Sequence, residues 1–175
     1  LMIVVVIVGV LSAIAIPSFQ NYIMKSRTTE ATEFLGVIRL SEESFRAEFG
    51  TYQATFAPNG NDVSLIDNNL VPTAPSKDPV EFTPNDEWTR LGARPSGRVR
   101  FAYGVAAGTP GDAPSSLGWD AANADFWWVA RAVGNLDGDS ASVVFEAYSA
   151  TKNIFITGIG SAADGAEEAG SKGWE

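Results

Sequence analysis

The chain has 175 residues, with 12 basic and 21 acidic side chains, a formal net charge of −9 and a pI near 4.5. It contains neither histidine nor cysteine, which excludes a Ser-His-Asp triad, a cysteine nucleophile, an ordinary zinc site and any disulfide. Only carboxylate chemistry remains open, and no acidic pair stands in a recognisable catalytic setting, so we expect neither an enzyme nor a cofactor.

The first predicted element is the uncharged segment 1–24, which ends just before the first charged side chain, Lys25. As a helix it would be about 36 Å long, enough to cross a hydrocarbon core of about 30 Å. No basic residue precedes the apolar run, as one would in a secretory signal, and an amphipathic pattern continues directly out of it. Hydropathy alone leaves two interpretations open, a single-pass membrane anchor and a helix that other helices cover.

The order of residues in this segment resembles the N-terminal helix of bacterial type IV pilins and of the related type II secretion pseudopilins. The resemblance spans roughly residues 1–30 and rests on LMIVV, Gly9, AIAIP ending in Pro17, and Tyr22. In that family the mature chain begins with a methylated phenylalanine and has a glutamate directly before the leucine that aligns with Leu1. We expect these residues to precede Leu1 in the protein.

The resemblance implies that segment 1–24 forms the core of a filament in which neighbouring helices cover one another. The residues expected at this assembly surface are Leu1, Val6, Gly9, Ile14, Pro17 and Tyr22. Gly9 and Pro17 both weaken a helix, and the resemblance implies that the stretch between them unwinds as subunits pack. The alternative is a membrane helix that simply tolerates both residues.

The helix is predicted to continue in amphipathic form over 25–52. Its apolar stripe is Ala31, Phe34, Leu35, Ile38, Phe45, Phe49 and Tyr52. Five of these, Phe34, Leu35, Ile38, Phe45 and Phe49, are expected to pack the helix on a sheet. The charged residues fall mostly in other directions, and Glu42 and Arg46, four apart, are expected to form an ion pair. Electron conduction along the aromatic rings is an alternative, but core packing explains their positions.

The rest of the chain predicts a loop followed by a sheet, and hence an α+β fold. Segment 53–97 is rich in proline and reads as an irregular connection. The predicted strands of an antiparallel meander are 99–105, 126–133, 143–148 and 154–157. Alternation in the first strand predicts burial on one face only. The expected layout is a filament-core helix at 1–24 and a globular head at 25–175, divided into 25–52, 53–97, 98–158 and a tail at 159–175.

Two clusters have a functional and a structural interpretation. Oxygen-bearing side chains at Asn135, Asp137, Asp139 and Glu146 have part of the spacing of a calcium loop, but Ser140 replaces the usual glycine, which favours a plain acidic hairpin. The second cluster is Arg90, Arg94, Arg98 and Arg100. It could bind nucleic acid, but the acidic chain favours charge pairing within or between subunits, so we predict no specific nucleic acid partner.

These observations predict a structural protein, the major subunit of a type IV pilus-like filament. By resemblance, its partners are identical copies, a prepilin peptidase, and a membrane platform with a cytoplasmic ATPase. The monomer would lie in the inner membrane with its head outside the cytoplasm, and the assembled filament would be extracellular. Alternatives are a type II secretion pseudopilin and a membrane-anchored ligand-binding module; adhesion, motility and DNA uptake remain open roles.

Overall fold

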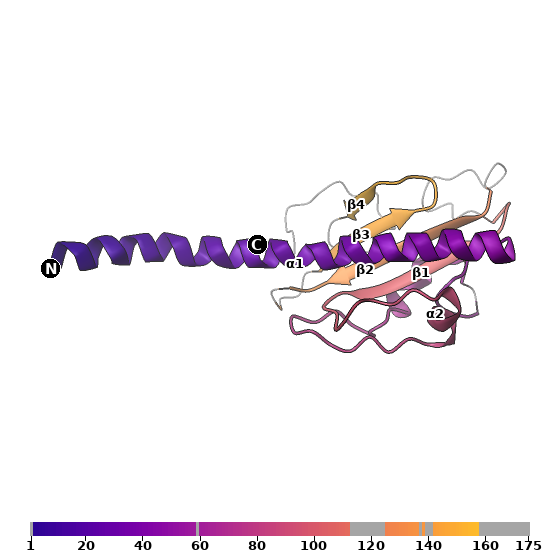
Figure 1. Ribbon diagram of the computed structural model, residues 1–175, viewed down its shortest axis with the longest axis horizontal. Helices are drawn as coiled ribbons and strands as arrows, with labels where there is room; N and C mark the ends of the chain where they lie inside the picture. The colour runs from indigo at the N-terminus through magenta and orange to yellow at the C-terminus, as the bar shows by residue number, and fades with distance from the viewer. Residues whose placement is uncertain (1, 59, 113–124, 137, 139–141, 158–175) are drawn as a thin grey trace.

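The computed structural model describes residues 2–58, 60–112, 125–136, 138 and 142–157. One long helix, α1 (Met2–Phe49), dominates the molecule: its first half projects freely and its second half lies along a globular head (Figure 1). Within these described residues, the head contains a four-stranded sheet and two short helices, η1 (Val63–Asn68) and α2 (Asp86–Leu91). The predicted α+β fold, a long helix packed on an antiparallel sheet, is confirmed.

The sheet is an antiparallel meander with the order β1-β2-β3-β4. Its strands are β1 (Ala102–Gly108), β2 (Trp127–Gly134), β3 (Val143–Tyr148) and β4 (Ile154–Thr157). The bounds of β3 and β4 coincide with the predicted ones, whereas β1 begins three residues later than predicted. The reason is that Val99 pairs with Val80 instead, in an isolated bridge with two backbone hydrogen bonds of 2.8 Å.

One face of the sheet is covered by the second half of α1. Ala31, Leu35 and Ile38 are fully buried there, in one cluster with the β1 and β2 side chains Tyr103 and Trp128. This burial of apolar surface is the main force that holds helix and sheet together.

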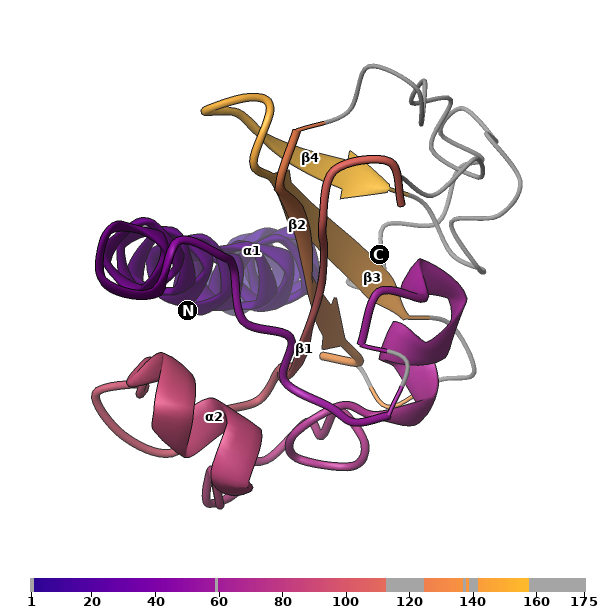
Figure 2. The same ribbon diagram turned by 90° about the vertical axis from the view of Figure 1, so that its right-hand side faces the viewer.

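The other face of the sheet is covered by the segment that the sequence presents as an irregular loop. Phe56, Val63, Ile66 and Leu70 from the loop and η1 pack against the outward side chains of β1 and β2 in a second cluster (Figure 2). The prediction that β1 is buried on one face only is therefore wrong. Small residues make the close approach possible: a Cβ on Gly104 would lie 2.8 Å from Cγ2 of Ile66.

The short helix α2 is a further element that the loop prediction missed. Asn85 caps its N-terminus by accepting a hydrogen bond from the Trp88 amide, and Gly92 ends it in the left-handed region with φ of 74°. The Trp88 indole is fully buried beside the rings of Phe34 and Phe82. The helix thus supplies an aromatic side chain to the core at the edge of α1.

A buried ion pair fastens η1 to the sheet. Arg131 and Glu146 face each other across β2 and β3, with the Arg131 Nε donating to the Glu146 carboxylate over 2.5 Å. Arg131 also pairs with Asp67 of η1 at 3.1 Å, and the Tyr148 hydroxyl donates to Glu146. Glu146 is therefore engaged in the core and does not serve a calcium loop. Asp137, Asp139 and Ser140 lie outside the described residues, while Asn135 accepts a hydrogen bond from the Gly138 amide.

The close packing of Phe101 on β2 predicts a sharp difference between two glycine substitutions. A Cβ on Gly134 would overlap the buried Phe101 ring, 2.6 Å from Cδ1, so Gly134→Ala should destabilise the head by about 1–3 kcal/mol. A Cβ on Gly36 of α1 meets nothing within 4 Å, so Gly36→Ala should stabilise it by about 0.5–1 kcal/mol.

Urea unfolding of a fragment that begins at Ser26 measures both effects, because this fragment lacks the apolar half of α1 and we expect it to be soluble and to unfold cooperatively. Equal effects of the two substitutions, or a stabilising Gly134→Ala, would contradict the packing described for β2.

Candidate functional site: the N-terminal helix

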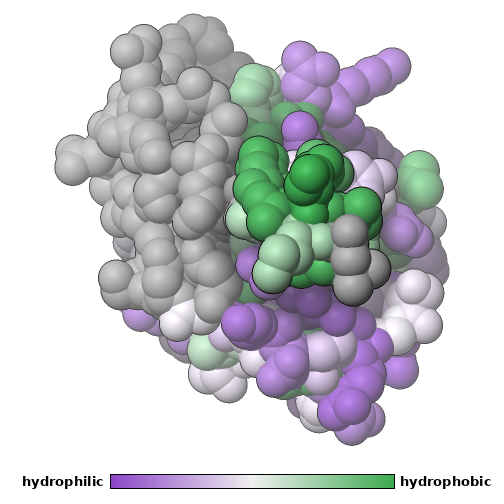
Figure 3. Space-filling view, turned by 90° about the vertical axis from the view of Figure 1, so that its left-hand side faces the viewer, coloured by the Kyte–Doolittle hydropathy of each residue, from purple (hydrophilic) through white to green (hydrophobic). Residues whose placement is uncertain are grey.

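The first half of α1 is an uncovered apolar surface. Val6, Ile14 and Tyr22 are 65%, 68% and 70% exposed, and nothing lies within 4 Å of a Cβ built on Gly9. Viewed from its N-terminal end, the helix presents hydrophobic residues next to hydrophilic ones of the head (Figure 3). Of the other predicted assembly residues, Leu1 lies outside the described part, and Pro17 is described only by its helical backbone.

By length and composition, α1 could cross a membrane. None of its most apolar stretch of 18 residues is buried inside the molecule. An apolar surface of this length is unstable in water and requires lipid or other protein around it. The sequence already contains this signal, and the structure adds that the head leaves the segment entirely open.

The helix is continuous from Met2 to Phe49, through both Gly9 and Pro17. Continuity is the arrangement expected of a single subunit in lipid, where unpaired backbone N–H and C=O groups are costly. The predicted unwinding between Gly9 and Pro17 concerns the assembled filament and stays a prediction.

The second half of α1 is where the expected helix–sheet residues lie. Phe34, Leu35 and Ile38 are buried, and Phe45 packs partly buried against the same cluster. Phe49 differs from the prediction, because it is 60% exposed and its ring contacts Phe45 at 4.5 Å between centroids. It occupies the last position of α1, where the helix ends, so the apolar stripe reaches beyond the part of the helix that is covered.

Polar side chains of α1 reinforce this packing at both borders of the helix. Glu30 accepts hydrogen bonds from the amides of Arg100 at 2.7 Å and Phe101 at 3.2 Å, and it also pairs with the Arg100 guanidinium at 3.7 Å. Charge pairing within the head therefore accounts for one member of the arginine cluster. On the other border, Arg39 donates to the backbone carbonyls of Thr151 and Lys152 at 2.9 and 2.6 Å.

The expected ion pair between Glu42 and Arg46 is absent from the described residues, because the two side chains point to different places. Arg46 donates to the Tyr52 hydroxyl and to Asp125, both at 2.9 Å. Glu42 is fully buried; one carboxyl oxygen accepts from the Gln53 amide at 3.0 Å, and the other has no hydrogen-bond partner among the described residues.

Burial raises the pKa of Glu42 to about 8, with the Gln53 amide opposing the shift and the neighbouring Glu43 adding to it. The carboxyl is therefore mostly neutral at physiological pH. Sequence reasoning missed this residue although a signal was present: positions 31, 35, 38, 42 and 45 follow one another at steps of four and three, which places Glu42 inside the apolar stripe.

The buried Glu42 predicts that the stability of the head depends on pH. Folded protein keeps the Glu42 proton up to about pH 8, whereas the unfolded chain releases it near pH 4.5. Folding between these values takes up a proton, so the free energy of unfolding falls as pH rises, by about 1.4 kcal/mol per unit for one group. Glu42→Gln abolishes this titration, and its stability relative to wild type should rise steadily from about pH 5 to about pH 8.

Urea unfolding at several pH values measures this difference. Glu48→Gln is the matched control, since it neutralises an exposed carboxyl of the same helix and should follow the wild-type pH dependence. A constant difference between Glu42→Gln and wild type across the range would show that Glu42 is ionised in the folded state.

Comparison with known proteins agrees with the architecture. Two fimbrial proteins of Pseudomonas aeruginosa are each 30% identical over 91 residues, which are 51% of this chain and 58% of each relative's own length. The type IV major fimbrial protein FimA of Dichelobacter nodosus is 31% identical over 124 residues, 71% of this chain and 70% of that protein. No known family model matches the chain, and no solved structure matches it.

The helix and the meander thus occur in a chain that is 31% identical to a type IV fimbrial protein over 71% of its own length and 70% of that protein's length. Fimbrial proteins are structural subunits, and the uncovered apolar helix fits anchoring in a membrane. This chain belongs to the type IV fimbrial proteins, the type IV pilins.

Proposed function

We propose that this protein polymerises into an extracellular filament by bundling the N-terminal halves of α1 from many identical copies. The observation that carries the proposal is that Met2–Ile16 is helical and open on every side, while the same helix is firmly packed in the head from Ala31 onward. A rigid helix of this kind places an apolar surface at a constant position relative to its head, which is what regular stacking of copies requires.

The composition of the uncovered half suits helix–helix contact. β-branched Val and Ile alternate with small residues such as Gly9, Ser12 and Ala13, which let neighbouring backbones approach closely. The open space around Gly9 leaves room for a second helix there. Membrane lipid would cover the same surface in the monomer, so assembly exchanges lipid contacts for helix contacts.

The proposed layout follows from this exchange. Segment 1–24 would form the filament core, and the head, 25–175, would surround it with the loop 53–97 and the meander on the outside. The monomer would wait in the inner membrane with its head outside the cytoplasm. Processing by a prepilin peptidase and extraction by a membrane platform with its ATPase are the steps that pilin resemblance implies, and adhesion, motility or DNA uptake would be roles of the finished filament.

A charge in the bundled segment should abolish assembly. Val6→Asp would bury a carboxylate among neighbouring helices at a cost of several kcal/mol, so sheared cell surfaces should show no filaments of this chain by negative-stain microscopy. Val6→Leu keeps the surface apolar and should leave filaments in normal number. Circular dichroism of the purified variants checks that the head stays folded, and normal filament yield from Val6→Asp would refute the assignment of the core.

The filament should also differ from the single subunit in the continuity of α1. Neighbouring helices shield the backbone between Gly9 and Ile16 from lipid and water, so unwinding there becomes tolerable, and five unwound residues would lengthen the subunit by roughly 9 Å. We expect a filament map at side-chain resolution to show a break in helical hydrogen bonding in this stretch. Unbroken α-helix from Leu1 to Tyr52 in such a map would contradict the unwinding, and a simple kink at Pro17 would then be the remaining interpretation.

A further inference from the structure

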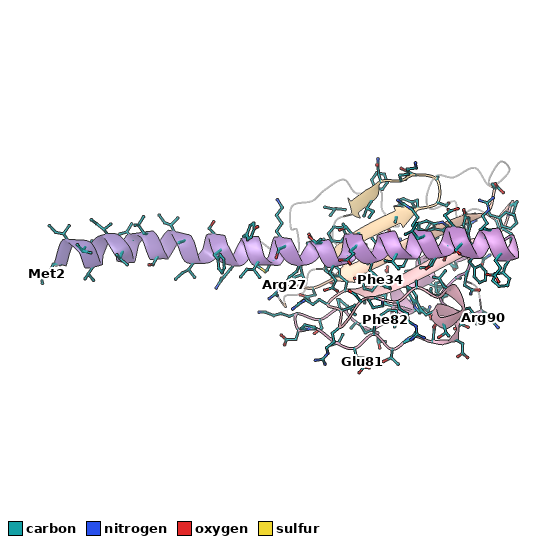
Figure 4. The ribbon with its side chains drawn as sticks, in the orientation of Figure 1. Met2, Arg27, Phe34, Glu81, Phe82 and Arg90 are labelled. Carbon is teal, nitrogen blue, oxygen red and sulfur yellow. The ribbon has the colours of Figure 1, made fainter. Side chains whose placement is uncertain are left out.

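An open cleft of about 420 Å³ lies on the head, outside the helix–sheet contact. Its lining is Glu81, Phe82, Pro84, Arg94, Pro95, Gly97 and Arg98. Figure 4 shows Glu81 and Phe82 on the flank of the head, with Phe82 toward Phe34 of α1. The volume lies within the range of small-molecule sites, about 300–1,000 Å³.

Two guanidinium groups border this cleft and have no partner among the residues that the structure describes. Arg94 and Arg98 are exposed, and neither makes a hydrogen bond, ion pair or ring contact with any residue that the structure describes. Arg100, two positions on, differs because Glu30 neutralises it. A guanidinium group without another partner is well suited to bind a carboxylate or phosphate, because it donates two parallel hydrogen bonds in its own plane.

The backbone that carries these groups is well fixed. The bridge between Val80 and Val99 is antiparallel, so the next residues on each side, Glu81 and Arg98, stand opposite each other. Arg94 follows buried Ala93, which lies two residues beyond the end of α2, and it precedes a proline, which restricts its backbone. The charges at the cleft are thereby held by core-anchored segments.

An aromatic side chain completes the wall. The ring of Phe82 packs edge-on against Phe34 at 5.6 Å and Trp88 at 5.2 Å, so it is held by the core while remaining partly exposed. Such a ring offers an apolar surface to the C–H face of a sugar. The Glu81 carboxylate on the same wall is an acceptor for hydrogen bonds from hydroxyl groups.

We propose that this cleft binds a carboxylated sugar, such as a uronic or sialic acid unit of an acidic polysaccharide. Arg94 and Arg98 hold the carboxylate, Glu81 accepts from the hydroxyls, and Phe82 contacts the ring. A DNA strand would satisfy the arginines, but beside its phosphodiester groups it offers no hydroxyl groups to Glu81, whereas a sugar acid carries hydroxyl groups next to its carboxylate. The proposal concerns the head alone, so it stands or falls independently of filament assembly.

Calorimetric titration of the full chain in a non-ionic detergent tests this with trigalacturonate as the probe. We expect trigalacturonate to bind, and its methyl ester, which lacks the negative charges, to bind about tenfold or more weakly. Arg94→Gln and Arg98→Gln should each weaken binding of trigalacturonate by about tenfold. The matched control is Arg90→Gln, which removes the same charge from an exposed position outside the cleft, apart from Glu81 and Phe82 (Figure 4), and should bind as wild type.

A second comparison separates the sugar from nucleic acid. Glu81→Gln should weaken binding of the uncharged methyl ester, because it removes a strong acceptor for the hydroxyl groups of the sugar, but it should strengthen binding of a hexathymidylate probe, because it removes a repulsive charge. The proposal is overturned if trigalacturonate does not bind, if Arg90→Gln costs as much as Arg94→Gln, or if hexathymidylate binds wild type as tightly as the sugar does. Near-ultraviolet circular dichroism of each variant confirms that binding is compared between folded proteins.

Discussion

The burial of one face of a single helix on a sheet is the contact on which the rest of this molecule depends. Ala31, Leu35 and Ile38 disappear completely into the core, and the same rigid helix then carries an apolar surface far outside the head. The second half of α1 has one apolar stripe, which the head itself buries. The first half is apolar on all sides, and only lipid or other chains can cover it. Their continuity in one helix couples the orientation of the head to whatever covers the projecting half.

Polar contacts at the borders between α1 and the head fix the position and rotation of the helix on the sheet. Apolar packing alone lets a helix slide or rotate, whereas Glu30 on one border and Arg39 on the other bind particular backbone groups of the sheet and its turns. Burial, followed by the charge of Glu30, also raises the pKa of Tyr103, which keeps that hydroxyl a donor. In a chain without cysteine, contacts of this kind take the place of covalent staples in keeping helix and head in one arrangement.

The sheet is the middle layer of the head, with α1 on one face and part of the loop on the other. Loop residues therefore form much of the surface on the side away from α1. Phe56 and residues 63–70 cover the face away from α1, and the ion pair between Arg131 and Glu146 ties η1 to that face through Asp67. The remainder of the loop, between the bridged residues Val80 and Val99 and including α2, supplies the charged cleft. The long connection between helix and sheet therefore contributes both a structural layer and a chemically distinctive surface.

Local patterns in the sequence were sufficient to predict the long helix, the strands β3 and β4, and the apolar segment that lipid or partner helices must cover. Each of these depends on the spacing of neighbouring residues, which a linear sequence carries directly. The buried face of β1 under Ile66, the pairing of Val99 with Val80 and the exposure of Phe49 depend on which distant segments meet, and no local period encodes that. Glu42 lies between these cases: its position in the stripe is readable at steps of three and four, but only the packed core shows that a carboxyl is buried there with one oxygen unpartnered among the described residues. Spacing along the chain thus determined the long helix and the order of the strands, and long-range packing decided which of their faces, edges and charges stay open to a partner.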